Sequence, residues 1–332
     1  MRKLYFLLPG TEGKFGGGGL WAELKTVRLA QKICDAEIVT YRQKESNYLF
    51  LPDILNTVGR NDSIFVVNWG FDVPKLISKL NKYNIIYHAH SAGYGFRLPS
   101  QIPIIAVSRN TMGYWGEQAA NSLIYYLPNQ LGTEFYDAEK PRDIDILVQT
   151  RKSSQYLLKQ LIPTLQTCCQ VEIIDRYIED LAGLFNRSKV YLYDSAQYWK
   201  VSGVTEGFGL PPLEALACGC HVFSSVNHAL ADHLDPEFNC YKIGCYGLEY
   251  DLKRILKVIR ADTKPQLSPS FWEQYREDNL LKRLQVILEE INLFFDFKGE
   301  IEHQVTGLNF WRVRQLKINR LFTKIQSKVF NK

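Results

Sequence analysis

The sequence has 332 residues, of which 46% are hydrophobic and 23% charged, and its formal net charge is +5. This length allows two ordinary domains, and this composition excludes disordered, collagen-like and fibrous proteins. The apolar runs are strand-sized, whereas a membrane-spanning helix needs about 20 apolar residues, so we expect no transmembrane segment. The seven cysteines lack metal-type spacing. We therefore expect a soluble, cytoplasmic protein with reduced thiols and no nucleic-acid partner.

The first 130 residues alternate short β-rich runs with helical patterns, which is typical of parallel α/β units. The sequence predicts a strand over residues 4–8, then a glycine-rich loop and a helix over 20–34. Further strands are predicted at 37–41, 63–68, 84–87, 104–107 and 123–127. Together these elements predict one doubly wound, Rossmann-like domain over residues 1–130.

Two features of this first domain are candidate substrate contacts. A run of four glycines that includes Gly17 and Gly18 lies between the first strand and the first helix. Glycines let the backbone approach a diphosphate or an acceptor closely, although a merely flexible surface loop would also use them. His88 and His90 follow the strand at 84–87. An imidazole can donate a hydrogen bond or share a proton, whereas a histidine satisfied by neighbouring backbone has no such role.

The second half of the sequence repeats the alternation of strands and helices. Strands are predicted at 144–148, 171–174, 190–193, 221–224 and 240–243, and helices at 155–165, 178–186, 213–217, 248–260 and 272–295. A polar, turn-rich stretch over 128–141 predicts the domain boundary, so we expect a second Rossmann-like domain over 131–300. Open parallel sheets bind ligands outside the carboxyl ends of their strands, and two such domains would face each other across a cleft.

Residues 206–220 form the most informative stretch, because Glu206 and Glu214 flank a Gly-Phe-Gly turn and a helix. We expect a proline, Pro211 or Pro212, at the first helical position and Glu214 in the first turn. A helix N-terminus offers unpaired N–H groups and a partial positive charge, which favours a diphosphate. A carboxylate repels phosphate and accepts hydrogen bonds, so its natural ligand is a hydroxyl group. Phosphate flanked by hydroxyl groups describes a nucleotide sugar.

With this motif in a two-domain α/β chain, the sequence resembles the retaining glycosyltransferases of the GT-B fold, in particular glycosyltransferase family 4 (glycosyl transferases group 1). The family's donor site carries a Glu, seven residues and a second Glu, which Glu206 and Glu214 match. The resemblance implies that Glu214 holds the ribose hydroxyls of the donor and that Glu206 holds its sugar hydroxyls near the reacting carbon. Backbone N–H groups would position the sugar and its diphosphate, namely those of Gly207, Phe208, Gly209 and Leu210.

The resemblance also implies roles outside this motif. His90 takes the position of a family histidine that contacts the donor sugar near the reacting centre, with Ser91 in place of the family's Asp. Arg151 and Lys152 would neutralise the donor diphosphate, although the family's Gly-Arg is missing there and both could be ordinary surface charges. Residues 227–229 stand where the family often has paired glycines near the donor sugar.

The expected function is retaining transfer of a sugar from a nucleoside-diphosphate sugar to an acceptor hydroxyl, on a glycan, a surface polysaccharide or a lipid-linked acceptor. The sequence has no Asp-x-Asp pair in a suitable loop, and fixed positive groups can replace a metal, so we expect no metal and no further cofactor. Two alternatives remain open. One is a nucleotide-sugar epimerase or phosphorylase on the same fold, and the other is a nucleotide-sugar-binding protein that has lost turnover.

The C-terminal tail over residues 301–332 is a third predicted segment. From residue 311 onward its apolar residues fall at helical spacing and it has no acidic residue, as in a basic amphipathic helix. Such a helix either packs on the protein or attaches to the anionic inner face of a membrane, where each basic residue contributes on the order of 1 kcal/mol. The basic residues are Arg312, Arg314, Lys317, Arg320, Lys324, Lys328 and Lys332, and the apolar ones are Ile318, Leu321, Phe322, Ile325 and Val329.

Overall fold

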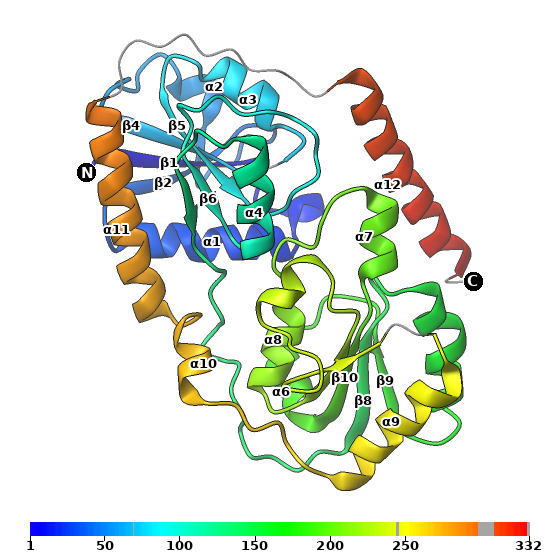
Figure 1. Cartoon of the computed structure of the whole chain (residues 1–332). Coiled ribbons are helices and arrows are strands. Elements are labelled where there is room, and N and C mark those ends of the chain that lie inside the picture. The colour runs from blue at the N-terminus through cyan, green and yellow to red at the C-terminus, as the bar shows by residue number, and fades with distance from the viewer. Residues whose placement is uncertain (69, 244–245, 298–308, 331–332) are drawn as a thin grey trace. The chain divides into compact units, whose positions relative to one another are not determined.

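The computed structural model describes residues 1–68, 70–243, 246–297 and 309–330, with the backbone alone for Lys14 and residues 323–330 (Figure 1). Contacts divide the chain into two compact units. The first consists of Met1–Gln130 and Gln274–Gln315, and the second of Leu131–Glu273 and the residues from Leu316 onward. Each unit is built on its own parallel sheet.

The first unit contains a seven-stranded sheet with the strand order β3-β2-β1-β4-β5-β6-β7. The order reverses at β1, because β2 pairs with one side of it and β4 with the other. The predicted strands of this domain are present, together with the two-residue β3, which the sequence pattern does not predict. The strands are β1 Lys3–Leu8, β2 Ala36–Thr40, β3 Leu49–Phe50, β4 Ser63–Val67, β5 Asn84–Ala89, β6 Ile104–Ala106 and β7 Ile124–Tyr126.

Helices cover both faces of this sheet, and the strands are therefore apolar on both faces. Side chains of β1 alternate between the two faces, as the period of a strand requires. Tyr5 and Leu7 pack with the helices α2, α3 and α4, whereas Leu4 and Phe6 pack with α1 and α11. The helices are α1 Gly18–Gln31, α2 Leu51–Ile54, α3 Val73–Lys79, α4 Arg109–Gln118 and α11 Glu277–Asp296.

Helix α11 belongs to the first unit because of its apolar stripe. Leu280, Leu284 and Ile291 recur at helical spacing and are buried against α1 and the sheet, and Figure 1 shows α11 beside that sheet. The sequence pattern predicts that the second domain extends to residue 300, whereas the contacts group the described part of 274–300 with the first unit. The predicted boundary at 300 itself lies outside the described residues.

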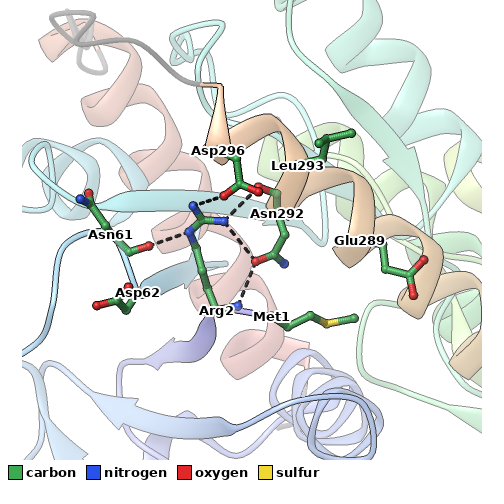
Figure 2. A pocket seen from close by; sticks show the side chains of 8 residues that line it. All are labelled: Met1, Arg2, Asn61, Asp62, Glu289, Asn292, Leu293 and Asp296. Atoms are coloured by element: carbon green, nitrogen blue, oxygen red, sulfur yellow. Dashed lines mark hydrogen bonds and ion pairs between the residues drawn. The ribbon is translucent and has the colours of Figure 1, made fainter.

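Hydrogen bonds in a pocket beside the start of β1 hold the same helix, α11, in place (Figure 2). The guanidinium group of Arg2 is held through all three of its nitrogens. Nε donates to the Asn61 carbonyl at 2.6 Å, Nη1 to the Asn292 carbonyl at 2.9 Å and Nη2 to Asp296 Oδ1 at 2.6 Å. This pocket lies at the amino end of β1, away from the carboxyl edge where such sheets bind ligands, so we assign it a structural role.

The second unit contains a five-stranded parallel sheet with the order β12-β11-β10-β8-β9. The order reverses at β8, because β9 pairs with one side of it and β10 with the other. These five strands agree with the predicted ones, and β9 and β11 have the predicted bounds. The strands are β8 Ile144–Gln149, β9 Val171–Ile174, β10 Ser188–Tyr193, β11 His221–Ser224 and β12 Tyr241–Lys242.

The helices of the second unit differ from prediction in several places, and α6 and α10 do not have the predicted bounds either. The predicted helix over 155–165 is a π-helix over Leu157–Leu161 that continues as α5, Ile162–Leu165, and the wider turn accommodates Pro163. A helix that the sequence pattern does not predict, α7 Ala196–Ser202, follows β10, and α8 begins at residue 210 instead of 213. The remaining helices are α6 Leu181–Arg187, α8 Leu210–Ala217, α9 Leu248–Ala261 and α10 Pro269–Glu273.

The C-terminal tail forms the helix α12, Phe310–Phe330, as its apolar spacing predicts. The predicted contact residue Lys332 lies outside the described residues, as do the side chains of Lys324, Ile325, Lys328 and Val329. Within the described part of the chain, every helix is too short or too polar to cross a bilayer. The six described cysteines are free thiols.

Candidate functional site

The candidate donor site lies in the second unit, at the carboxyl ends of β8 and β10. Open α/β sheets bind ligands where the strand order reverses, and it reverses between these two strands. The loop after β8 carries Lys152, the loop after β10 carries Ser195, and the loop before α8 carries Glu206. Hydrogen bonds to the Glu206 side chain join these three loops.

Glu206 is almost completely buried, with 4% of its surface exposed. Its Oε2 accepts three hydrogen bonds, from Tyr193 Oη at 2.6 Å, Trp199 Nε1 at 2.6 Å and Ser195 Oγ at 3.1 Å. Its Oε1 lies 3.3 Å from Lys152 Nζ. Protein donors therefore saturate one oxygen, and Oε1 is the oxygen with capacity for a further hydroxyl group.

The surroundings of Glu206 keep it ionised. Burial alone would raise the pKa of this carboxyl group, but the Lys152 ammonium and the hydrogen bonds from Tyr193 and Trp199 outweigh burial, and the pKa lies below its usual value. Lys152 also stands 4.4 Å from the centroid of the Trp199 ring, in a cation–π contact. Of the two predicted diphosphate contacts, Lys152 reaches this cluster, whereas Arg151 is exposed.

Strained backbone surrounds the same cluster. Lys152, Val226 and His228 have φ values of 70°, 44° and 52°, in the left-handed region that favours glycine. Such residues cost about 1–3 kcal/mol each and gather at functional sites. His228 lies within residues 227–229, where family 4 often has paired glycines, and Val226 directly precedes this stretch. The backbone here has the positive φ that glycine favours, although neither residue is a glycine. The ring of His228 also contacts the cluster, because its Nδ1 accepts a hydrogen bond from the Glu206 N–H at 3.3 Å.

The start of helix α8 differs from the prediction. Leu210 is the first helical residue, so Pro211 and Pro212 occupy the second and third positions, and neither has an N–H group. This N-terminus offers fewer donors to an anion than a helix of ordinary composition. Gly209 precedes it with a φ of 80°, and a Cβ at this position would lie 2.2 Å from Leu230 Cδ2. Only glycine fits there.

The second carboxylate of the motif is also buried. Glu214 is 8% exposed and is the fifth residue of α8, which corrects the prediction that it lies in the first turn. Burial, followed by the charge of Glu214, raises the pKa of the Tyr191 phenol, so this charge lies close to β10. Gly207 is buried, and the buried Phe208 ring packs on His233 with 5.2 Å between centroids. The Gly-Phe-Gly turn is thus part of the packed interior.

The first unit places another buried carboxylate at the end of its sheet. Glu23 lies on α1, and His88 and His90 lie at the end of β5. Both imidazoles contact the same oxygen, since His88 Nδ1 is 2.6 Å and His90 Nε2 is 2.5 Å from Glu23 Oε2. The two ring centroids are 4.4 Å apart. The predicted catalytic residue His90 is therefore paired with a carboxylate that the sequence patterns do not single out.

Burial and the neighbouring charges set the protonation of this cluster. Burial alone would raise the pKa of Glu23, but the charges and hydrogen bonds of His88 and His90 outweigh it and hold the pKa below its usual value. Burial, followed by the charge of His88, lowers the pKa of His90. At neutral pH the carboxylate is ionised and His90 is neutral.

The same cluster is the one group in the described residues whose ligand atoms lie close enough to share a metal ion. Zinc accepts two imidazoles and a carboxylate, with bonds near 2.0 Å, so its ligand atoms lie about 3.3 Å apart in a tetrahedron. The separations of 2.5 and 2.6 Å between the ring nitrogens and Glu23 Oε2 are those of hydrogen bonds instead. As arranged, Glu23, His88 and His90 form a hydrogen-bonded cluster.

The tetraglycine run opens helix α1. Gly17 is the N-cap and Gly18 the first helical residue. A Cβ built at either position would meet no atom within 4 Å, and neither residue has a positive φ. The packing and backbone of the protein therefore do not require glycine at these two positions. Open space here is compatible with a ligand that approaches the backbone and with a flexible loop.

Several contacting residues escape prediction from sequence. Glu23 could have been identified from the helical pattern, because it lies on the buried stripe of α1, three residues after Leu20 and four before Val27. A charge on such a stripe needs a partner. No sequence pattern identifies the partners of Glu206, since they come from separate segments that only the fold brings together. The missed residues are Glu23, Tyr193, Ser195, Trp199 and the ring of His228.

No protein-family model matches the sequence, and no curated protein matches it either. Solved structures match in fold. HepE from Anabaena, in complex with UDP and glucose, has a TM-score of 0.62 at 13% identity over 87% of this chain and 100% of HepE. A glycosyltransferase from Rickettsia africae ESF-5 has a TM-score of 0.62 at 12% identity over 87% of this chain and 98% of that one.

Sucrose-phosphate synthase from Thermosynechococcus elongatus has a TM-score of 0.55 at 14% identity, over 88% of this chain and 97% of the synthase. At these identities the likeness shows the fold alone. The chain has the GT-B fold, with a seven-stranded and a five-stranded parallel sheet in two Rossmann-like domains, which confirms the predicted fold class. Membership of glycosyltransferase family 4 stays a prediction, because no family model matches.

Proposed function

We propose that the protein is a glycosyltransferase that moves a sugar from a nucleoside-diphosphate sugar to an acceptor hydroxyl group. The observation that carries this proposal is the buried, ionised Glu206 beside Lys152, at the strand-order reversal of the second unit. A fixed anion suits sugar hydroxyls, and an adjacent ammonium suits a diphosphate. Structures of the same fold include HepE with UDP-glucose, which supports a uridine nucleotide as the donor.

The geometry suggests how donor binding rearranges this cluster. In the proposed complex the Lys152 ammonium turns from Glu206 Oε1 to the diphosphate, and a sugar hydroxyl takes its place at Oε1. Oε2 keeps its three protein donors, so the carboxylate does not move. Glu214 would accept hydrogen bonds from the ribose hydroxyls, and the N–H of Leu210 would remain for the phosphate because two prolines follow it.

The same arrangement bears on the reaction course and on metal use. We infer retention of configuration, in which the leaving phosphate oxygen helps to deprotonate the acceptor, so that no protein nucleophile takes part. Lys152 and Arg151 would supply the positive charge at the diphosphate, and we therefore infer that turnover requires no metal ion. Loss of turnover in EDTA that magnesium or manganese restores would contradict this inference.

A thermal-shift screen against nucleotide sugars tests the donor. A bound ligand stabilises the folded state, by about 2.7 kcal/mol at a free concentration of 100 times Kd. We expect stabilisation by one uridine- or guanosine-diphosphate sugar and none by a free sugar. Absence of any shift across the panel would contradict the proposal.

Calorimetry on Glu214→Ala then tests the site. Hydrogen bonds to a charged group contribute about 1.5–3 kcal/mol each, so we expect donor affinity to fall by about 10- to 100-fold. Glu249→Ala is the matched control, because Glu249 is an exposed glutamate on α9 of the same unit. Equal affinities for the two variants would remove Glu214 from the site.

Two other activities on this fold are distinguished by product analysis. A transferase releases nucleoside diphosphate only when an acceptor hydroxyl is supplied. An epimerase converts the nucleotide sugar without an acceptor, and a phosphorylase requires phosphate. Tight donor binding without turnover on a broad panel of glycan, polysaccharide and lipid-linked acceptors would indicate a binding protein that has lost catalysis.

The exposure of α12 supports a second proposal, attachment to an anionic membrane surface at the inner face. Phe310, Trp311, Leu321 and Phe322 are 58–70% exposed, whereas a helix that packs its apolar side on the protein would bury them. Arg314, Lys317 and Arg320 are exposed on the same helix. An exposed aromatic and basic surface matches the chemistry of an anionic interface, where it would bring the enzyme to a lipid-linked or surface-glycan acceptor.

Vesicle flotation tests this attachment. We expect the protein to float with vesicles that contain phosphatidylglycerol and not with pure phosphatidylcholine. Replacing Trp311 and Phe322 by Ala should abolish flotation, because these side chains supply the apolar contact. Flotation that is equal for both lipids, or unchanged in this variant, would contradict the proposal.

A further inference from the structure

The cluster of Glu23, His88 and His90 has an unusual hydrogen-bond geometry. Two imidazoles converge on one carboxylate oxygen, and the side chains of Glu23 and His88 are 1% and 2% exposed. Both histidines come from one strand end, whereas Glu23 comes from α1, the helix that the tetraglycine run opens. The carboxylate thus reaches across from another element to hold both rings.

This geometry determines which ring nitrogens carry the protons. The Glu23 carboxylate is ionised, so it has no hydrogen to donate. Each imidazole must therefore donate from the nitrogen that contacts Oε2, which is Nδ1 in His88 and Nε2 in His90. A neutral imidazole has one N–H group, and the opposite nitrogen of His90, Nδ1, then carries a lone pair.

The His90 ring is the more accessible of the two imidazoles. The His90 side chain is 18% exposed, compared with 2% for His88. The Nε2 atom of His88 is buried without a hydrogen-bond partner, so that ring braces the carboxylate and faces no solvent. Of the two rings, His90 is the one that a substrate can reach.

We propose that Glu23 is a positioning residue that locks His90 in its Nε2–H tautomer, so that Nδ1 accepts a hydrogen bond from a substrate hydroxyl group. The tautomer follows from the structure alone, whereas the hydroxyl ligand rests on the proposed transferase function. His90 thereby acts as an acceptor for a sugar or acceptor hydroxyl and not as a donor. The titratable groups that face the His90 ring in this cluster are Glu23 and His88.

Nitrogen-15 NMR of the histidine-labelled full chain tests the tautomer without any assumption about function. The sequence has six histidines, and His90→Ala identifies the His90 signals by difference. We expect a protonated Nε2 and an unprotonated Nδ1 at pH 7. In Glu23→Gln the ring should lose this single tautomer, because an amide can also donate a hydrogen bond to it. An Nδ1–H tautomer in the unmodified protein, or an unchanged tautomer in Glu23→Gln, would overturn the proposal.

Steady-state kinetics test whether the tautomer serves turnover. We expect kcat of Glu23→Gln to fall by roughly 10- to 100-fold, the loss of one charge-assisted hydrogen bond. Glu23→Gln added to His90→Ala should cost little more, because Glu23 acts through His90. Glu289→Gln, an exposed change on α11 of the same unit, is the control for handling. Additive losses would show that Glu23 acts independently of His90 and would overturn the positioning role.

Two further outcomes are distinguishable. Stoichiometric zinc in the purified protein, lost in Glu23→Gln, would replace the hydrogen-bonded cluster by a metal site and overturn the proposal. If no nucleotide sugar is turned over while NMR gives the expected tautomer, the proposed function fails and the positioning of His90 by Glu23 stands.

Discussion

The two sheets of this protein each end beside a buried carboxylate, and the two carboxylates differ in their partners. Glu206 accepts hydrogen bonds from the hydroxyl of Tyr193 and the indole of Trp199, which keep their protons across neutral pH. Glu23 is hydrogen-bonded to two imidazoles. The second unit therefore presents a fixed charge, suited to holding a ligand. The first unit presents the His90 ring, whose protonation depends on burial and on Glu23 and His88. Such a ring suits a group that exchanges a proton or a hydrogen bond with a ligand.

The glycines beside these carboxylates show the same contrast. Gly209 is required by a φ of 80° and by Leu230, whereas Gly18 has open space around its Cα. Glycine in the second unit thus serves the packing of the protein itself. At Gly17 and Gly18 of the first unit, packing and backbone give no reason for glycine, which leaves a ligand or a flexible loop as the reason.

The largest expected effect on stability comes from removing the fixed charge of Glu206. Glu206→Ala removes the acceptor of the buried Tyr193 hydroxyl and of the half-buried Trp199 indole, and we expect it to lower the free energy of unfolding by about 3–5 kcal/mol. Urea denaturation measures this loss. Glu172→Ala is the matched control, since Glu172 is exposed on β9 of the same sheet. Similar stabilities for the two variants would remove the distinction between a buried and a surface carboxylate.

The next effect concerns the glycine that packing requires. Gly209→Ala adds a Cβ that overlaps Leu230 in a left-handed backbone, and we expect a loss of about 2–4 kcal/mol in the free energy of unfolding. Thermal and urea unfolding give this value. A double change with Leu230→Ala should recover part of the loss by removing the overlap. No recovery would assign the whole effect to the backbone.

A smaller effect on stability comes from the titration of His90, in the cluster with Glu23 and His88. The pKa of His90 is lowered in the folded protein, chiefly by burial, so the unfolded chain takes up this proton first as the pH falls. The stability linked to His90 is therefore complete above the unfolded pKa of about 6.5 and is lost as the pH falls below it. We expect the unmodified protein to lose more stability between pH 7 and pH 5 than His90→Gln. Equal losses would contradict the pKa direction.

The smallest effect concerns the glycine that packing does not require. Gly18→Ala should raise the free energy of unfolding by about 0.5–1 kcal/mol, because alanine is the better helix residue and its Cβ meets no atom. The same variant should turn over more slowly if a ligand approaches this backbone. Higher stability with unchanged turnover would instead assign the run to a flexible loop.

Most of the fold could be predicted from the sequence, because strands buried on both faces give short apolar runs that periodicity detects. The two-residue β3 and the helix α7 were not predictable in this way. Residues 196–202 contain no buried side chain, so this helix has no apolar stripe. The start of α8 was also mispredicted, because a proline normally marks the first helical position, whereas here Leu210 precedes Pro211 and Pro212 in the helix.

The site was predictable only where chemistry is local in sequence. Glu206, Gly209 and Glu214 lie within one motif, and the structure buries all three. The partners of Glu206 lie in the loop after β8, at the end of β10, in the loop after it and in α7, and no spacing rule connects them. Glu23 is intermediate, since a charge on an apolar stripe predicts a buried partner without naming His88 or His90.

The assignment of α11 to the first unit has a consequence for synthesis. The second unit's sheet is made in one uninterrupted run of the chain, whereas the first unit lacks one cover of its sheet until residue 296 has been made. At about 5–20 residues per second the ribosome needs on the order of 10–30 seconds to travel from residue 130 to that point. During this interval the sheet face that carries Leu4, Phe6 and Val66 has the cover of α1 without that of α11, so we expect the nascent first unit to be a client for chaperones although it emerges before the second.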